Sequence, residues 1–393
     1  MILSRSIPHA LLVSLVSVAL RSSAPAQPAP AATNAPPARR GDPPLVSPEV
    51  HPDRTVTFRV RAPKAVEVSV SGEWPDGTKA MSRDDQGVWS VTVGPLEPDL
   101  YGYGVSVDGF RALDPSNGSV KPMRSPTTSI LEVPGDRPVL QDFQPNVPHG
   151  TVRLHTYASK ALGKLRRLQV YTPPGYDQKT RARYPVLYLF HGSGDNEATW
   201  TALGHAQFIA DNLIAQGRAK PLIIVMTDGH ASFAQPAGGS SDNRGRALEA
   251  FQRDLLEEVM PFVAADYRTR VDRESRAIIG LSMGGNQSLT IGLNHPELFA
   301  WVGGMSSAVR EPEQAVGRAL ADAKSVNQKL RLLWFACGKD DFLLKQNQQF
   351  DELLTARGVK HEFKLTEGNH SWPVWRRYLE DFLPRLFTAP GRK

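Results

Sequence analysis

The sequence of 393 residues predicts an α/β domain built on a mostly parallel sheet, preceded by a small all-β sandwich of the immunoglobulin type. Between residues 45 and 134, short segments alternate apolar and polar residues and are separated by Gly, Pro and Asp, which is typical of sandwich strands. From residue 151 to 388, continuous apolar strands alternate with segments of helical period, which indicates a parallel sheet covered by helices. Residues 135–150, rich in Pro and Gly, are expected to link the two domains.

The N-terminus has the features of a secretory signal peptide. Arg5 precedes an apolar run from Ala10 to Leu20, and the A-x-A pattern of Ala24-Pro25-Ala26 follows, so we expect cleavage that removes residues 1–26. The apolar run is too short to span a bilayer as a helix, and no membrane span is expected in the mature protein. Residues 27–44, rich in Pro and Ala, are expected to be an extended spacer. The sequence therefore predicts a secreted or periplasmic protein.

Composition argues against several classes of function. The formal net charge of +6 is spread along the chain without a long run of Lys or Arg, so no nucleic-acid partner is expected. The single cysteine, Cys337, cannot form an intramolecular disulfide and does not decide the compartment. The sequence has no P-loop, no G-x-G-x-x-G, no H-E-x-x-H and no cluster of Cys and His. We therefore expect neither a cofactor nor a metal.

Secondary-structure elements follow from the same periodicities. In the sandwich, the expected strands are 55–60, 66–70, 88–93 and 101–105. Asp108-Gly109 is a signal for a tight hairpin turn. In the α/β domain, the expected strands are 168–172, 186–190, 222–226, 277–279 and 332–336, and the expected helices are 208–216, 248–263 and 375–387.

The motif GLSMGG at residues 280–285 matches G-x-S-x-G, the pattern of a nucleophile elbow. It follows an apolar strand, and a helix can begin behind it at Gln287, which is the strand-turn-helix context that an exposed nucleophile needs. Glycines on both sides let strand and helix approach closely, and a helix N-terminus favours negative charge. We therefore expect Ser282 to be a catalytic nucleophile, rather than part of an ordinary Gly-rich turn.

A nucleophilic serine needs a general base, and with this motif the base follows the nucleophile along the chain. Three histidines follow Ser282, namely His295, His361 and His370. His295 is expected to end a helix, and His361 is expected to face solvent on an edge strand. His370 lies in a loop before the last helix, so we expect His370 to be the general base.

An acid that orients the base is expected on the loop after the strand that ends at Ala336. Asp340 and Asp341 are both candidates, and the residues alone do not choose between them. The aspartate that does not orient the base would cap the following helix at Phe342.

Stabilisation of a tetrahedral intermediate requires N–H donors near the nucleophile. The backbone N–H of Met283, directly after the serine, is one expected donor. The second is expected from the loop at 191–195, where we favour the N–H of Ser193, with Gly192 as the near alternative. His191 in the same loop is interpreted as structural rather than as a second base.

Three further side chains could line a substrate cleft. His230 follows a strand at the rim of the sheet, although a simple loop histidine fits its position equally well. Trp200 and Trp372 could hold an aromatic part of a substrate, or they could equally belong to the core.

These motifs together resemble the esterase-D family, which includes the feruloyl esterases of carbohydrate esterase family 1 and enterochelin-esterase-like proteins. The resemblance covers about residues 151–387 and is carried by HGSGDNEATW, DGH, GLSMGG, CGKDD and GNHSWPVWR. It implies an α/β-hydrolase domain without a cofactor. The family pattern C-G-x-x-D implies that the acid is Asp341, and its G-x-H pattern matches His370.

The N-terminal domain resembles the early-set sandwich of carbohydrate-binding module 48. The segments FRVRAP, VSVSGEW, GVWSVTVGPLEPDLYGYGVSVDG and DPSN carry this resemblance. In such modules Trp side chains can stack on sugars, and Trp74 and Trp89 are the candidates here. The alternation around Trp89 favours a core or hairpin position for both.

The combined prediction is a secreted serine carboxylic-ester hydrolase that forms an acyl-enzyme. The substrate is expected to be a feruloyl or related acyl ester on plant cell-wall polysaccharide such as xylan. Alternative substrates are an enterochelin-like siderophore and an acetyl or short polyester. The non-enzymatic alternative is a carbohydrate-binding protein with a degenerate hydrolase domain.

Overall fold

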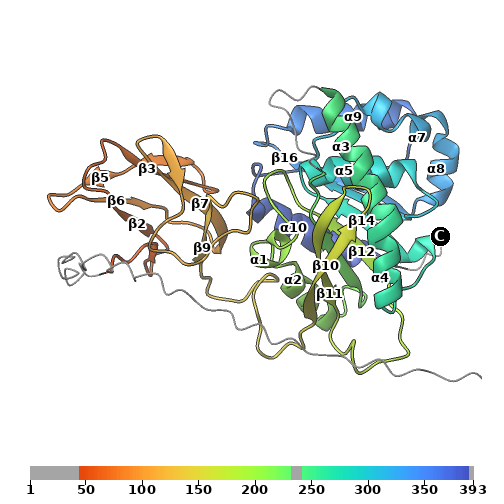
Figure 1. The fold of residues 1–393 in the computed structure, drawn as a ribbon, viewed down its shortest axis with the longest axis horizontal. Coiled ribbons are helices and arrows are strands. Elements are labelled where there is room, and N and C mark those ends of the chain that lie inside the picture. The colour runs from red at the N-terminus through yellow and green to blue at the C-terminus, as the bar shows by residue number, and fades with distance from the viewer. Residues whose placement is uncertain (1–43, 232–240, 389–393) are drawn as a thin grey trace, which may run out of the picture. The chain divides into compact units, whose positions relative to one another are not determined.

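Two antiparallel sheets form the predicted sandwich (Figure 1). One sheet has the order β1 (Glu49–Val50), β2 (Val56–Arg61), β6 (Val88–Val93) and β5 (Ser82–Arg83). The other has the order β4 (Thr78–Ala80), β3 (Val68–Gly72), β7 (Asp99–Val107) and β8 (Phe110–Ala112), with β9 (Ser129–Val133) also paired to β7. On β2, Val56, Phe58 and Val60 are buried in the sandwich core, as a period of two predicts.

The two tryptophans considered for sugar stacking belong to this core. Trp74 stacks on Phe58 with ring centroids 5.4 Å apart. The indole N–H of Trp89 donates to the carbonyl of Ala62 at 2.9 Å. Both rings are buried, which supports the interpretation of Trp74 and Trp89 as core residues.

The computed structural model describes residues 44–231 and 241–388. The predicted signal peptide, and the predicted spacer up to residue 43, lie outside the described residues, so both stay predictions. None of the described helices is long and apolar enough to cross a membrane. The sandwich and the α/β domain belong to one compact unit that begins at Leu45.

An eight-stranded sheet forms the centre of the α/β domain. Its order is β10 (Thr151–Ser159), β11 (Lys164–Thr172), β13 (Ile223–Thr227), β12 (Val186–Phe190), β14 (Arg276–Gly280), β15 (Trp301–Met305), β16 (Leu332–Gly338) and β17 (Glu362–Thr366). Strands β10 and β11 are antiparallel to their neighbours, and the pairs from β13 to β17 are parallel. The predicted fold class is confirmed.

Helices cover both faces of this sheet (Figure 1). They are α1 (Thr199–Ala202), α2 (Ala206–Ala215), α3 (Ser241–Arg253), α4 (Met260–Asp266), α5 (Met283–Asn294), α6 (Pro312–Ala315), α7 (Gly317–Ala321), α8 (Ala323–Lys329), α9 (Leu344–Ala356) and α10 (Trp372–Phe382). A π-helical turn over Asp254–Val259 joins α3 to α4, so the helix expected at 248–263 is longer than predicted. Alternate residues of β12 enter two separate core clusters, Tyr188 in one and Leu189 in the other, which explains its continuous apolar sequence.

The predicted linker packs closely against the α/β domain. The side-chain amide of Asn212, on α2, donates to the carbonyls of Leu140 and Asp142. The imidazole of His149 bonds to the carboxylate of Asp211 at 3.0 Å. This segment is therefore a fixed part of the fold and holds the end of the sandwich close to α2.

A buried arginine joins the sandwich to the last helix. Arg376 on α10 is 1% exposed, and its guanidinium lies 2.6 Å from the carboxylate of Asp99 at the start of β7. The same group donates to the carbonyls of Leu203 and Leu100. Because these partners lie on β7 and on the segment after α1, this side chain fixes α10 against both.

We expect Arg376→Leu to lower the free energy of unfolding by about 3–5 kcal/mol, because it removes the buried guanidinium from the carboxylate of Asp99 and from the carbonyls of Leu203 and Leu100. The control is Arg385→Leu, since Arg385 pairs with Glu362 and Asp381 at partly exposed positions. We expect that control to cost at most about 1 kcal/mol. Urea denaturation measures both, and equal losses would contradict the anchoring role of Arg376.

Candidate active site

The turn between β14 and α5 places Ser282 in a strained backbone conformation. Its φ is +53° and its ψ is −112°, a combination that residues with side chains rarely adopt. A Cβ on Gly280 would lie 2.4 Å from the carbonyl oxygen of Gly284, and a Cβ on Gly284 would lie 2.5 Å from that of His191. Both positions therefore require glycine. The helix begins at Met283, directly after the serine, and not at Gln287 as the sequence predicted.

Neighbouring backbone groups hold this turn in place. The N–H of Ser282 donates to the carbonyl of Met305 at 2.8 Å, and the N–H of Ala308 donates to the carbonyl of Ser282 at 3.1 Å. The loop after β15 therefore fixes the serine on both sides of its Cα. The strain is maintained by surrounding hydrogen bonds, as is usual where a side chain must be exposed for function.

The structure brings together the three side chains predicted to form a triad. His370 Nε2 lies 3.0 Å from Ser282 Oγ. His370 Nδ1 lies 2.9 Å from one carboxylate oxygen of Asp341 and 3.1 Å from the other. Ser282 follows β14, Asp341 follows β16 and His370 follows β17, so the three residues meet at the carboxyl edge of the parallel strands.

Asp341, and not Asp340, occupies the position beside the base. The carboxylate of Asp341 is buried, whereas Asp340 is exposed. Burial alone would raise the pKa of Asp341, but hydrogen bonds from His370 and Ser306 outweigh burial and hold that pKa below its usual value. Asp341 also accepts the N–H of Leu343 at 2.8 Å, which fixes the turn before α9. The N-cap of α9 has no side-chain hydrogen bond, so neither aspartate caps this helix.

Two aromatic rings contact the imidazole of His370. Trp375 meets it edge to face with centroids 4.8 Å apart, and its indole N–H donates to Ser306 Oγ. Phe342 lies 4.4 Å from the imidazole centroid and is 76% exposed. The helix expected to start at Phe342 begins at Leu344 instead. The place of Phe342 directly after the acid is the sequence signal for its contact with the base.

A lone thiol lies under this site. Cys337 on β16 is fully buried and lies four residues before Asp341. Burial and the nearby charge of Asp341 raise the pKa of the thiol to about 12.

The loop that follows β12 passes directly beside the serine. A Cβ on Gly192 would lie 3.5 Å from Ser282 Cβ. His191 Nε2 accepts the N–H of Gly229 at 2.8 Å, so Nδ1 carries the proton and donates to the carbonyl of Gly192 at 2.8 Å. This bond fixes the peptide group whose N–H belongs to Ser193. His191 thus has the structural role that was expected.

Met283 is the first residue of α5, so its N–H has no acceptor within the helix. Because Met283 directly follows Ser282, this N–H lies where the first oxyanion donor is expected. The donor pair formed by Met283 and Ser193, or Gly192 in place of Ser193, stays a prediction.

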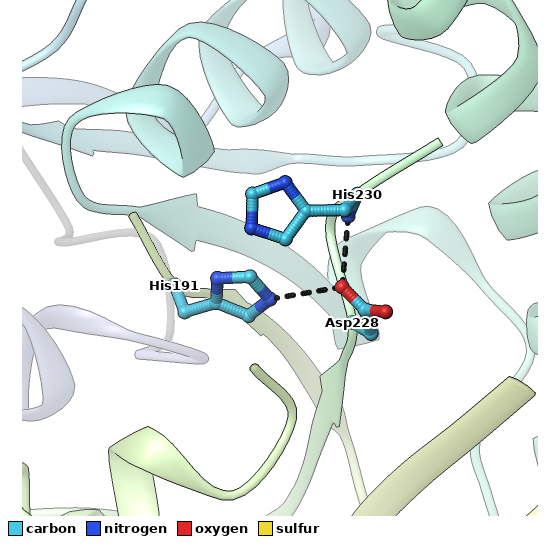
Figure 2. Close-up of side chains that lie close together, drawn as sticks. All are labelled: His191, Asp228 and His230. Atoms are coloured by element: carbon cyan, nitrogen blue, oxygen red, sulfur yellow. Dashed lines mark hydrogen bonds and ion pairs between the residues drawn. The ribbon is translucent and has the colours of Figure 1, made fainter. Parts of the chain in front are cut away.

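One group of side chains among the described residues, His191, Asp228 and His230, has donor atoms close enough to share a metal ion (Figure 2). The hydrogen bonds of the group do not fit that use. His191 Nε2 is occupied by the N–H of Gly229, and Asp228 Oδ1 accepts the N–H of His230 at 2.9 Å. The buried guanidinium of Arg166 lies 3.5 Å from Asp228 and donates to the carbonyls of Asp228 and His230. Its positive charge disfavours a cation, and the group instead supports the loop after β13.

The three residues considered for substrate contact differ in their positions in the structure. Trp200 and Trp372 are each 1% exposed and meet edge to face with centroids 5.0 Å apart. Packing inside the core leaves neither ring a free face, which corrects the expectation of substrate contact. His230 lies on the loop after β13, where a Cβ on Gly229 would lie 3.3 Å from Met283 Cε. Its role in substrate binding stays a prediction.

The two other histidines that follow Ser282 are not part of this site. His295 ends α5, as expected. His361 was expected to face solvent, but its imidazole bonds to Asp351 at 2.7 Å and stacks on Phe335. Helix α9 carries Asp351 over the edge of the sheet, and this long-range contact has no local sequence signal.

Residues 159–386 match the family model described as "Putative esterase". The chain belongs to this esterase family. A xylanase/feruloyl esterase of Xylanibacter ruminicola is 34% identical over 86% of this chain and 46% of its own length. An esterase of Mycobacterium tuberculosis is 33% identical over 60% of this chain and 59% of its own length. The chain therefore spans about half the length of the curated relatives it matches.

Solved structures agree with membership of the esterase family. A ferulic acid esterase is 29% identical and covers 62% of this chain and 100% of its own, with a TM-score of 0.53. The enterobactin esterase of Shigella flexneri is 20% identical and covers 84% of this chain and 92% of its own, with a TM-score of 0.61. The second likeness concerns the fold alone.

We expect stability to depend on pH through His230. Burial, together with His191 and Arg124, lowers the pKa of His230 from 6.5 to about 4. Between these two values the unfolded chain binds a proton that the folded chain does not, so stability falls as pH falls through this window. The loss is on the order of 3 kcal/mol at most.

Urea midpoints measured from pH 7 to pH 4 test this expectation. His230→Gln should show a shallower fall than the wild type. An unchanged slope in His230→Gln would show that its imidazole does not titrate in this way.

Proposed function

We propose that this protein is a carboxylic-ester hydrolase that forms an acyl-enzyme on Ser282. The observation that carries the proposal is the unbroken hydrogen-bond chain from Asp341 through His370 to Ser282, with bonds of 2.9 and 3.0 Å. Membership of the esterase family supports the same reaction. The strained turn that exposes the serine and the adjacent N-terminus of α5 supply the remaining parts of such a centre.

In the proposed reaction, Ser282 Oγ attacks the ester carbonyl while His370 Nε2 accepts the hydroxyl proton. Asp341 remains ionised, because its pKa is held low, and it stabilises the imidazolium through Nδ1. The N–H of Met283 and that of Ser193 or Gly192 would stabilise the oxyanion. Collapse expels the alcohol, which takes the proton from His370, and water repeats the sequence on the acyl-enzyme.

Ser282→Ala should lower turnover on p-nitrophenyl acetate by a factor on the order of 10⁶, because no nucleophile remains. Asp341→Asn should lower it by about 10⁴, because the imidazole loses its orientation and its charge partner. The matched control is Asp340→Asn, an exposed neighbour that should keep wild-type turnover. Activity in Ser282→Ala equal to the wild type would contradict the proposed nucleophile. Wild-type protein that binds polysaccharide but cleaves no ester would instead favour a binding protein.

For the substrate, we propose a feruloyl or related aromatic acyl ester on a plant cell-wall polysaccharide. The names of a relative and of a solved structure, a xylanase/feruloyl esterase and a ferulic acid esterase, support this class. The exposed ring of Phe342, 4.4 Å from the imidazole of His370, offers an apolar surface where an aromatic acyl group could pack. The predicted export of the chain would bring it to such a substrate.

Phe342→Ala should lower kcat/KM on methyl ferulate by about 2- to 13-fold, the value of one aromatic contact of about 0.5–1.5 kcal/mol. Turnover of p-nitrophenyl acetate should stay near the wild-type value, because its acyl group has no ring. Phe342→Leu, which keeps apolar area but not the ring, separates stacking from simple burial. An equal loss on both esters would show that Phe342 supports His370 and does not select the acyl group.

A panel of methyl ferulate, p-nitrophenyl acetate, feruloylated arabinoxylan and enterobactin distinguishes the remaining alternatives. Ferulate release from arabinoxylan supports the proposed substrate. Cleavage of the acetyl ester alone retains the esterase and removes the feruloyl assignment. Preference for enterobactin would assign a siderophore substrate instead.

A further inference from the structure

The sandwich contacts the loop that carries the expected oxyanion donor. Between β8 and β9, the segment 120–124 lies against this loop, and Met123 pairs with Asp195 in an antiparallel bridge. The N–H of Arg124 donates to the carbonyl of Gly194 at 3.0 Å. Farther along, Thr199 Oγ1 donates to the carbonyl of Pro122 at 2.7 Å. Backbone bonds therefore connect a surface segment of one domain to the loop beside Ser282.

A buried ion pair strengthens this contact. The ammonium of Lys121 lies 2.7 Å from Asp195 Oδ1, and the two side chains are only 13% and 4% exposed. At such a position the attraction between charges is screened much less by solvent than at the surface. Asp195 lies three residues after Gly192, and its N–H donates to the carbonyl of Gly192 at 3.3 Å. Asp195, the partner of Lys121, thus bonds through its backbone to the same carbonyl of Gly192 that His191 contacts.

The same lysine lies beside the loop that carries the proposed base. Its ammonium is 5.5 Å from the ring centroid of Trp372, the first residue of α10. The N–H of Trp372 donates to the carboxylate of Glu73, which follows β3 in the sandwich, at 2.9 Å. His370 lies two residues before Trp372. One corner of the sandwich therefore contacts both loops that flank Ser282.

We propose that Lys121 is a positioning residue for ester hydrolysis, which holds the 192–195 loop in register with Ser282 through its ion pair with Asp195. This inference rests on the proposed function. An oxyanion forms only in the transition state, and donors stabilise it well only when they are fixed within about half an ångström. Loss of Lys121 should therefore lower kcat and leave KM nearly unchanged, because the ground-state contacts of the substrate remain.

The test compares Lys121→Met with Lys79→Met in the full chain. Met keeps the length of the side chain and removes its charge, and Lys79 forms a solvent-exposed ion pair with Asp76 in the same domain. On p-nitrophenyl acetate, Lys121→Met should lower kcat at least tenfold with KM within twofold of the wild type. Lys79→Met should behave as the wild type.

A boronic acid that forms a tetrahedral adduct on serine provides the second readout. Lys121→Met should weaken its binding by a factor similar to the loss in kcat, because the adduct also needs the oxyanion donors. Lys121→Arg keeps the charge and should restore most of the kcat. Asp195→Asn combined with Lys121→Met should cost less than the sum of the two single changes, since both remove the ion pair between Lys121 and Asp195.

The outcomes separate the inference from the proposed function. Wild-type activity that is lost in Ser282→Ala, together with an unchanged kcat in Lys121→Met, overturns the role of Lys121 alone. A higher KM with unchanged kcat also overturns it, because Lys121 would then contact the substrate. Urea denaturation measures the folded fraction of each variant. If kcat of Lys121→Met falls only in proportion to that fraction, and Lys121→Arg does not restore it, the role of Lys121 is purely structural and the inference is overturned as well. A wild-type protein that cleaves no ester overturns both proposals.

Discussion

The close contact between β14 and α5 is the constraint on which the rest of the site depends. Neither Gly280 nor Gly284 has room for a Cβ, so the chain can pass from strand to helix within the few residues around Ser282. The strained φ of the serine follows from that sharp turn, and it exposes the hydroxyl above the sheet. Parallel strands then bring the loops after β12, β16 and β17 to the same edge as the serine, where Asp341 bonds to His370 and His370 bonds to Ser282.

Features with a local cause could be predicted from the sequence. Apolar runs predicted the buried strands, and the glycines around Ser282 predicted the nucleophile elbow. Both structures depend on residues that are neighbours in the sequence. Asp341 and Asp340 could not be separated by their residue types, since the difference is burial beside His370. The family pattern favoured Asp341, and the structure places that carboxylate next to the imidazole.

Features that depend on distant segments could not be predicted. The bond between Glu73 and Trp372 joins residues 299 positions apart, and neither residue shows it in its local sequence. Burial of Trp200 and Trp372 follows from their mutual packing between α1 and α10, so the local sequence of each leaves substrate contact and core as equal alternatives. Exposure of Phe342 has the opposite cause, because the turn before α9 directs its ring away from the core.

Burial of the Cys337 thiol protects the protein from oxidation of its cysteine outside a reducing environment. Thiolate, and not thiol, reacts with oxidants and with disulfides. With no exposed surface and a pKa near 12, the sulfur has no path to an oxidant and almost no reactive form at neutral pH. The only cysteine of the chain is therefore chemically silent, and it can neither crosslink two copies nor be converted to an acid while the fold is intact.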